Sequence, residues 1–353
     1  MKAWLRDWPF HLVVFLLVIL GLLNQWSAGG PHYFWRYLLF SFGGLVVYGI
    51  FIFWDYRRWA LGKVFWLYLL YALLLAYLAL THRRWLYFGG FSLQPSEFAK
   101  PLLVVLLGLF LSGLEGEVLS LPFFLGAMGV VLLPALLIAS TDLDQAFMIV
   151  LIGFTIVSFA GLSRRLILGL SLLALLTGFL VGPVLWHHLK PYQRARITAF
   201  LKPGKTQKRW SYQTQQALIA VGSGGLKGEG FGKGLSAKLH YLPAKHTDLA
   251  FAVWAEEWGF LGSTLLLTLY GVLLGLGLRA AYLARDHLGR FLAFGATACL
   301  FWQIFINLGG VIRLLPTASV PLPFLSYGGS AYLTNMILLG IIASVLKRRF
   351  SFM

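Results

Sequence analysis

The sequence predicts an all-α, polytopic integral membrane protein. Of its 353 residues, 59% are hydrophobic and only 12% are charged, whereas a soluble domain carries about 25% charged residues. Apolar runs long enough to cross about 30 Å of hydrocarbon recur from one end of the chain to the other. We therefore expect a single transmembrane domain over residues 1–353.

The apolar runs predict about ten membrane-spanning helices. They fall near residues 9–27, 34–54, 60–80, 95–113, 121–140, 143–161, 165–186, 249–278, 290–312 and 321–346. An even number of spans places both termini on the same side of the membrane. The seventh and eighth helices are separated by one long hydrophilic loop, residues 187–248.

Lys and Arg in the short loops predict the orientation, because positive residues are retained in the cytoplasm. With the N-terminus inside, the cytoplasmic segments hold 13 of these residues and the opposite short loops hold 4. Both termini are therefore expected to be cytoplasmic. The long loop 187–248 is expected on the extracytoplasmic side.

The stretch LPAKHTDLAFAVWAEEWGF, residues 242–260, places carboxylates where they are costly. Asp248 lies at the expected membrane edge, and Glu256 and Glu257 follow in the apolar helix. Ionisable groups in such positions are rare and mark candidate functional sites. The alternative is that His246-Thr247-Asp248 only caps the helix N-terminus.

The long loop is basic and aromatic, and it contains seven glycines between Gly222 and Gly234. Arg194 and Arg196 would face anionic headgroups or a phosphate-bearing substrate, or simply lie on lipid as part of an interfacial segment. Glycines spaced in this way let backbone N–H groups converge on an anion, with Lys227 and Lys233 nearby. A flexible turn is the competing interpretation.

Three more polar clusters lie at the ends of predicted spans. In QPSEFAKP, Glu97 and Lys100 are three residues apart and can pair on one helical face, which would also serve packing alone. In STDLDQAF, Asp142 is either a helix cap or a functional group. RLLPTASVPLPFLSYGGSAY contains helix-breaking Pro and Gly, and such irregular backbone survives at membrane depth only where it is buried or lines a wet cavity. Four clusters on one side predict one extracytoplasmic cavity.

Several motifs together resemble the SEDS family (shape, elongation, division and sporulation). They are YQRARITAFLKP, YQTQQALIAVGSGGLKGEGFGKG, LPAKHTD with AEEWGFLG, QPSEFAKP and PLPFLSYGGS. The VPLPFLSYGGSA form and the short N-terminus are more similar to the RodA branch of the elongation machinery than to the FtsW branch of the divisome. The chain departs from the family at STDLDQAF, where Pro-Asp-Leu-Gly-Thr is usual, and at Arg313, where Gly is usual. These departures concern Asp144 and Arg313.

The resemblance implies a peptidoglycan glycosyltransferase in a bacterial cytoplasmic membrane. It would polymerise lipid II into β-1,4 glycan strands outside the membrane for cell elongation and shape, with a polyprenyl pyrophosphate leaving group. Its expected partners are a class B penicillin-binding protein, membrane proteins of the elongation complex, and membrane lipids. Asp248 matches the essential aspartate of the family and is the expected catalytic base.

The remaining site candidates have two roles. We expect substrate binding by Lys100, Arg194, Arg196, Lys227, Lys233 and Ser326. We expect supporting roles for Glu97, Asp142, His246, Glu256 and Glu257. The departing pyrophosphate needs cationic stabilisation, which either Lys and Arg supply alone or a divalent cation, Mg²⁺ or Mn²⁺, supplies at Asp248. We favour the ion.

The rival function is a transporter, either a lipid II flippase or a proton-coupled carrier using the intramembrane charges as a relay. Polar groups gathered on one side favour the enzyme, because alternating access places its site near the midplane between repeated halves, and the sequence has no evident internal repeat. A noncatalytic scaffold would leave the buried charges without a role. The net charge of +17 lies in loops between spans, so anionic lipid or phosphate is expected in place of nucleic acid.

Overall fold

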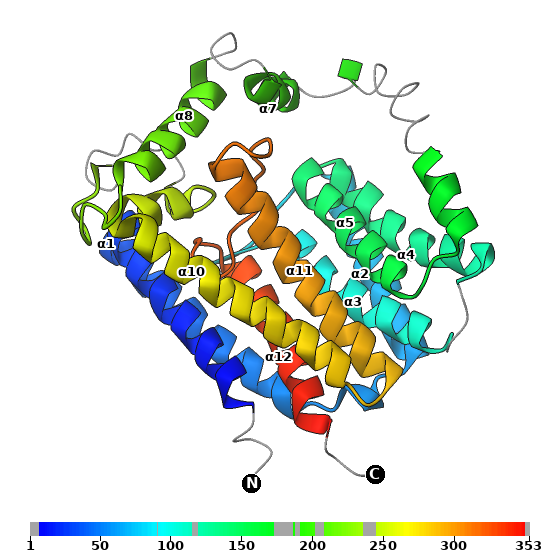
Figure 1. Cartoon of the computed structure of the whole chain (residues 1–353). Coiled ribbons are helices and arrows are strands. Elements are labelled where there is room, and N and C mark those ends of the chain that lie inside the picture. The colour runs from blue at the N-terminus through cyan, green and yellow to red at the C-terminus, as the bar shows by residue number, and fades with distance from the viewer. Residues whose placement is uncertain are drawn as a thin grey trace.

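The computed structural model describes residues 7–89, 91–114, 119–172, 186–187, 191–201, 208–235 and 245–349. Within these ranges the chain is a bundle of long helices (Figure 1). Seven of the helices are long and apolar enough to cross a membrane, and the apolar helix α5 is slightly shorter. The predicted all-α membrane fold is confirmed.

The first helix, α1 (Trp8–Phe53), is a hairpin of two spans. Its backbone leaves the helical region at Gly30, where φ is 74°, a conformation that glycine adopts without a Cβ clash. Beyond the turn the chain runs back, so that the ring of His11 bonds the hydroxyl of Tyr48. The predicted spans 9–27 and 34–54 are therefore both present, and the turn falls between them.

The next six elements run from residue 61 to residue 159, after a 3-10 turn at Tyr56–Arg58. They are α2 (Leu61–Leu80), a hairpin of β1 (Leu86–Phe88) and β2 (Phe91–Leu93), α3 (Pro95–Ser112), α4 (Leu121–Ala139) and α5 (Leu143–Phe159). The small hairpin was not predicted. It follows from the alternation in LYFGGFSL around a two-glycine turn, in which Leu86 pairs with Leu93.

The second half of the chain begins with a helix over residues 164–172. Then come α7 (Pro191–Leu201), α8 (Lys208–Ser223), α10 (Ala250–Leu283), α11 (His287–Val311) and α12 (Gly329–Arg348). The predicted tenth span was wrong at its start, since α12 begins at Gly329 and not at residue 321. Pro321 and Pro323 keep the preceding segment out of a helix, and Phe324 has φ of 64°.

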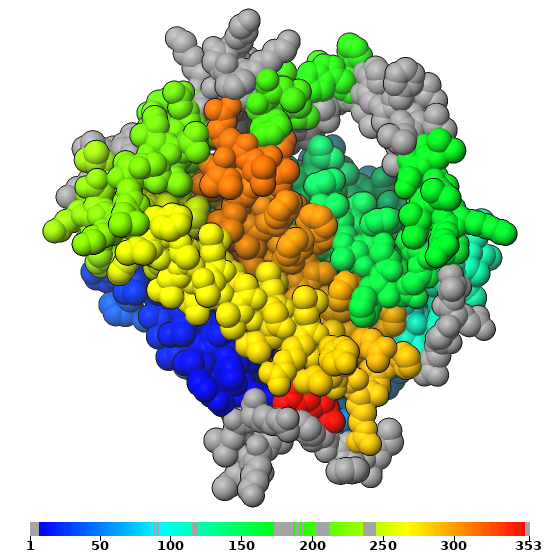
Figure 2. All heavy atoms as spheres, in the orientation of Figure 1, coloured from blue at the N-terminus to red at the C-terminus, as the bar shows by residue number. Residues whose placement is uncertain are grey.

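Helices α11 and α12 occupy the centre of the bundle. α11 packs against α10, α3, α5 and α12, while α12 also packs against both α3 and the α1 hairpin. Figure 2 shows α10, in yellow, lying across α1, in blue, with the yellow-green residues of α8 projecting beside them. The outer faces of α1, α2 and α10 carry many exposed apolar side chains, as expected for surfaces that contact lipid.

The two ends of the described chain meet at one end of the bundle. Arg349 pairs with Asp7 over 2.5 Å. Helices α7 and α8 lie at the opposite end (Figure 1), so these two helices of the long loop and the Asp7–Arg349 pair are at different ends of the bundle.

Candidate active site

Helix α10 is interrupted at Gly259, where φ is 62°, and a glycine-rich segment, residues 222–234, fills the break. Two N–H groups of that segment bond the carbonyls freed before the break, and two of its carbonyls accept N–H groups freed after it. The four bonds are Glu229 N to Glu256 O (3.0 Å), Gly230 N to Glu257 O (3.0 Å), Phe260 N to Gly225 O (2.8 Å) and Leu261 N to Leu226 O (3.1 Å). The break divides α10 into a short arm, residues 250–258, and a long span.

The glycines therefore serve close packing of two backbones. A Cβ built on Gly224 would lie 2.1 Å from the Ala255 oxygen. Because the N–H groups of Glu229 and Gly230 are already bonded to α10, they are not free for the predicted anion nest. Lys227 and Lys233 are exposed on this segment.

Asp248 lies in a turn, residues 245–249, directly before the short arm of α10. The N-cap residue of α10 is Leu249, whose side chain makes no capping hydrogen bond, so Asp248 lies one residue before the N-cap position. The turn is held from three sides. Gln25 Nε2 and Tyr327 N donate to the His246 oxygen over 3.1 and 2.7 Å, and Asn307 Nδ2 donates to the Asp248 oxygen over 3.0 Å.

The ring of His246 packs against Tyr33, with 4.3 Å between ring centroids. Burial lowers the pKa of His246, and the positive charge of Lys245 lowers it further. Burial also lowers the pKa of Lys245 itself, which the nearby Glu257 opposes. The residues directly before Asp248 are thus packed and partly shielded from water, and they hold its backbone in place.

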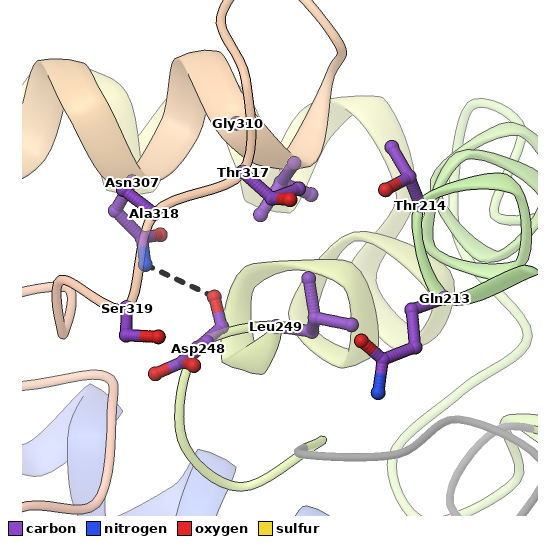
Figure 3. A pocket seen from close by; sticks show the side chains of 10 residues that line it. Gln213, Thr214, Asp248, Leu249, Asn307, Gly310, Thr317, Ala318 and Ser319 are labelled. Carbon is purple, nitrogen blue, oxygen red and sulfur yellow. Dashed lines mark hydrogen bonds between the residues drawn. The ribbon is translucent and has the colours of Figure 1, made fainter. Parts of the chain in front are cut away.

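The half-buried Asp248 lines a small pocket built from four parts of the chain (Figure 3). Its polar walls come from α8, the turn before α10, the last turns of α11, and the loop that follows α11. The polar side chains are Gln213, Thr214, Asp248, Asn307, Thr317 and Ser319. Figure 3 labels Asp248 and Ser319 among the residues that line the pocket.

Two residues hold the loop after α11 by hydrogen bonds to its backbone. Asp144 Oδ2 accepts a hydrogen bond from Ser319 N over 2.8 Å, and Asn307 Nδ2 donates to the Val320 oxygen over 2.7 Å. Asp144 stands where the resembling family usually has Gly. In this chain it ties α5 to a wall of the pocket.

A buried charged layer lies beside this loop. Lys100 Nζ and Glu97 Oε2 are 2.8 Å apart, with the two side chains 0% and 1% exposed, as the sequence predicted. Gln145 Nε2 donates to the other Glu97 oxygen over 2.7 Å. The pair is therefore compensated by both charge and hydrogen bonding, which makes its burial tolerable.

Asp142 caps α5 by accepting from Gln145 N over 3.3 Å, which confirms the capping interpretation. It also pairs with Arg84 and accepts from Gln94 Nε2 over 3.1 Å. Burial raises the pKa of Asp142, and Arg84 opposes that shift.

A family of cell cycle proteins that comprises FtsW, RodA and SpoVE matches residues 8–350. The chain belongs to this family. One similar member is stage V sporulation protein E of Bacillus subtilis, which is 35% identical with 95% of both chains covered. Another is peptidoglycan glycosyltransferase MrdB of Escherichia coli K12, which is 38% identical over 76% of this chain and 71% of its own length. The predicted resemblance is confirmed.

Two solved structures of the family share the fold. A chain of the structure described as "Structural coordination of polymerization and crosslinking by a peptidoglycan synthase complex" is 31% identical, with a TM-score of 0.82 and 98% of both chains covered. The rod shape determining protein RodA of Thermus thermophilus is 28% identical, with a TM-score of 0.70 over the same shares. The chain is thus a multi-pass membrane protein of a bacterial family.

Five of the expected substrate-binding residues have described side chains, and none of these five lines the pocket. Lys100 is paired in the core, Lys227 and Lys233 are exposed elsewhere, and Arg194 donates to the His187 oxygen. Ser326 is 4% exposed, and its Oγ accepts from Leu322 N over 2.9 Å within its own turn. The side chain of Arg196 lies outside the described residues, as do several loop cations.

The expected supporting carboxylates lie in the short arm of α10. Glu256 and Glu257 are each 1% exposed, and Ser27 donates to Glu257. Because α10 breaks just after them, they sit against α1 and the glycine-rich segment.

Sequence reasoning missed Asn307 and the α8 residues Gln213 and Thr214. Asn307 carried a usable signal, because an amide inside the apolar span 290–312 is costly unless it is bonded. Among the described residues, no group of three or more His, Cys, Asp and Glu side chains gathers to hold a metal. A divalent cation at Asp248 would therefore need oxygens from the substrate, as Mg²⁺ often does.

Proposed function

We propose that this chain joins lipid II disaccharide-peptide units into β-1,4 glycan strands. The observation that carries the proposal is a half-buried carboxylate, Asp248, that lines a pocket of hydroxyls and amides at one end of an apolar bundle. Family members with the names peptidoglycan glycosyltransferase and probable peptidoglycan glycosyltransferase support it.

The reaction assigned to this pocket is an inverting displacement. The acceptor hydroxyl oxygen attacks the anomeric carbon of the donor, and the new C–O bond forms as the bond to the pyrophosphate oxygen breaks. The proton of the attacking hydroxyl passes to the Asp248 carboxylate, and the bonding electrons leave with the polyprenyl pyrophosphate. A positioned base of this kind contributes about 10²- to 10⁴-fold in rate.

We place Asp248 on the extracytoplasmic face and both termini in the cytoplasm. The 13 to 4 distribution of Lys and Arg supports this orientation, as does the position of α8, which lines the pocket, far from the N and C labels in Figure 1. A membrane-impermeant label at Lys227 should react from outside and one at Arg285 only from inside. Labelling of both from one side would overturn the placement.

We further propose a class B penicillin-binding protein as partner, within the elongation machinery. The similar synthase complex coordinates polymerisation with cross-linking, which supports such a pairing. An apolar groove of about 270 Å³ between α10 and α11, lined by residues such as Tyr270, Phe301 and Phe305, suits hydrocarbon from a lipid or a partner helix.

The transporter is the second candidate, and its basis is the buried Glu97 and Lys100 pair. Glu97 pairs with Lys100 and accepts a hydrogen bond from Gln145. These contacts explain the burial of the pair by its structural role, without a transport cycle. This arrangement favours the enzyme.

The deciding experiment supplies purified protein with lipid II in detergent, with and without the cross-linking partner. The expected product is long glycan chains that a muramidase digests. If no chain forms in either case while lipid II crosses a vesicle membrane in the presence of the protein, the transporter is correct.

A further inference from the structure

Asn307 is buried in the wall of the pocket, with 3% of its surface exposed. Its Nδ2 donates to two backbone oxygens, those of Asp248 (3.0 Å) and Val320 (2.7 Å). Both partners are acceptors, so they fix which end of the amide is nitrogen. The amide cannot flip without placing its oxygen against two other oxygens.

The opposite end of this fixed amide has no partner. Oδ1 of Asn307 is buried and makes no hydrogen bond to any residue that the structure describes. Leaving a buried acceptor unpaired is costly, so native proteins rarely keep one without a water or a ligand. In Figure 3 this oxygen lies on the side of Thr317, away from the Asp248 carbonyl.

Among the polar side chains that line the pocket, Asn307 alone combines burial with an unfilled acceptor. Gln213, Thr214, Thr317 and Ser319 are half-buried, and their groups can turn toward water. Asn307 also bonds the backbone of the residue that carries the proposed base. An acceptor whose own side chain holds the backbone of the base residue, in the same pocket, is suited to read a donor on the same sugar.

We propose that Asn307 Oδ1 accepts a hydrogen bond from the sugar hydroxyl next to the one that attacks. This inference rests on the proposed function. Hydroxyls on neighbouring ring carbons lie side by side, so one sugar presents the attacking hydroxyl to Asp248 and its neighbour to Asn307. The contact selects acceptor sugars that carry a hydroxyl at that neighbouring carbon. It also orients the attacking oxygen.

The test compares lipid II with an analogue that lacks this neighbouring hydroxyl. The measured quantity is the ratio of kcat/KM for the two substrates, in detergent with the cross-linking partner present. We expect wild type to prefer natural lipid II by about tenfold, the effect of one hydrogen bond. Asn307→Ala should lower both values and bring the ratio close to one.

Gln303→Ala is the matched control. Gln303 lies one turn earlier on the same face of α11, is fully buried, and also has an unpaired oxygen, but it does not line the pocket. This variant should keep the wild-type ratio. An Asn307→Ala ratio equal to that of wild type, or a wild-type ratio of one, overturns the inference.

Two further measurements keep every outcome informative. If Asn307→Ala folds but shows no turnover, the ratio of the dissociation constants of the two substrates is measured in place of the ratio of kcat/KM. If Asn307→Ala does not fold, Asn307→Ser is tested with the same expectation. Wild type that polymerises natural lipid II but does not discriminate refutes only the role of Asn307. Wild type that polymerises nothing refutes the proposed function itself.

Discussion

The side-chain nitrogen of Asn307 donates a hydrogen bond to the backbone oxygen of Asp248 across 3.0 Å. This bond joins the end of the central helix α11 to the turn that carries the proposed base. The same nitrogen holds the loop after α11 through Val320. The position of Asp248 therefore depends on the end of α11 and on the loop that directly follows it.

Asp248→Asn should fold and insert but form no glycan. Asn keeps the size of the side chain and cannot take a proton, so the loss should reach about 10²-fold or more. Asp248→Glu should keep a trace, because a displacement of about 1 Å costs on the order of 10² in rate. Lipid II polymerisation and thermal unfolding measure the two effects, and an unchanged rate for Asp248→Asn would refute the catalytic assignment.

Glu97→Ala and Lys100→Ala should each destabilise the protein by about 3–5 kcal/mol, because each leaves an uncompensated buried charge. The exchanged pair, Glu97→Lys with Lys100→Glu, should recover part of that loss. Unfolding in detergent measures the stability. Two single variants with wild-type stability would contradict a buried pair.

Gly224→Ala should destabilise the junction between the glycine-rich segment and α10 by about 1–3 kcal/mol, because the new methyl group would meet backbone. The Cβ would lie 2.1 Å from the Ala255 oxygen, whereas a Cβ on Gly222 meets nothing within 4 Å. Neither glycine has a positive φ. Gly222→Ala is therefore the control, and equal melting temperatures for the two variants would disprove the close approach.

Stability should fall as the pH drops below about 6.5, through His246. Burial and Lys245 lower the pKa of this ring below its ordinary 6.5, so the unfolded chain binds a proton that the folded protein resists. The contribution is complete above pH 6.5 and is lost as the pH falls toward the lower pKa of the folded state. Melting temperatures across this range should fall less in His246→Gln.

His32→Gln is the control for that titration, because His32 is exposed near the turn of the α1 hairpin. It should follow the wild-type curve. A His246→Gln curve parallel to that of wild type would show that His246 does not contribute to the pH dependence.

Excess chelator should slow polymerisation, and added Mg²⁺ or Mn²⁺ should restore it. The described residues hold no group of three or more potential metal ligands, so the ion would bridge the substrate pyrophosphate and Asp248. The assay is run after carried-over metal is removed. Undiminished synthesis would assign charge stabilisation to Lys and Arg side chains alone.

The spans were predictable because the thickness of the membrane sets the length of apolar runs. The pairing of Glu97 with Lys100 was predictable for a similar reason, since residues three apart share a helical face. Both are local properties. The small β-hairpin also depends on a local pattern, the alternation in LYFGGFSL, which indicates a hairpin.

The walls of the pocket could not be predicted, because they come from tertiary contacts. Nothing in the sequence near Gln213 or Ser319 indicates that either lies beside Asp248. The Lys and Arg residues of the long loop were predicted to bind substrate because of their charge. Charge does not determine where the end of a long side chain lies in the folded protein. Gly259 within the predicted eighth span was a visible signal for the break, yet its partner segment lies about thirty residues earlier, and only the folded chain pairs them.

The break in α10 makes the glycine-rich segment mechanically continuous with the pocket. Four backbone bonds fasten residues 225–230 to residues 256–261, and the arm between the break and Asp248 is only about three turns long. The arm has no slack in which to absorb a displacement. A protein that binds the exposed side of this segment would therefore contact residues that are bonded directly to the arm bearing Asp248.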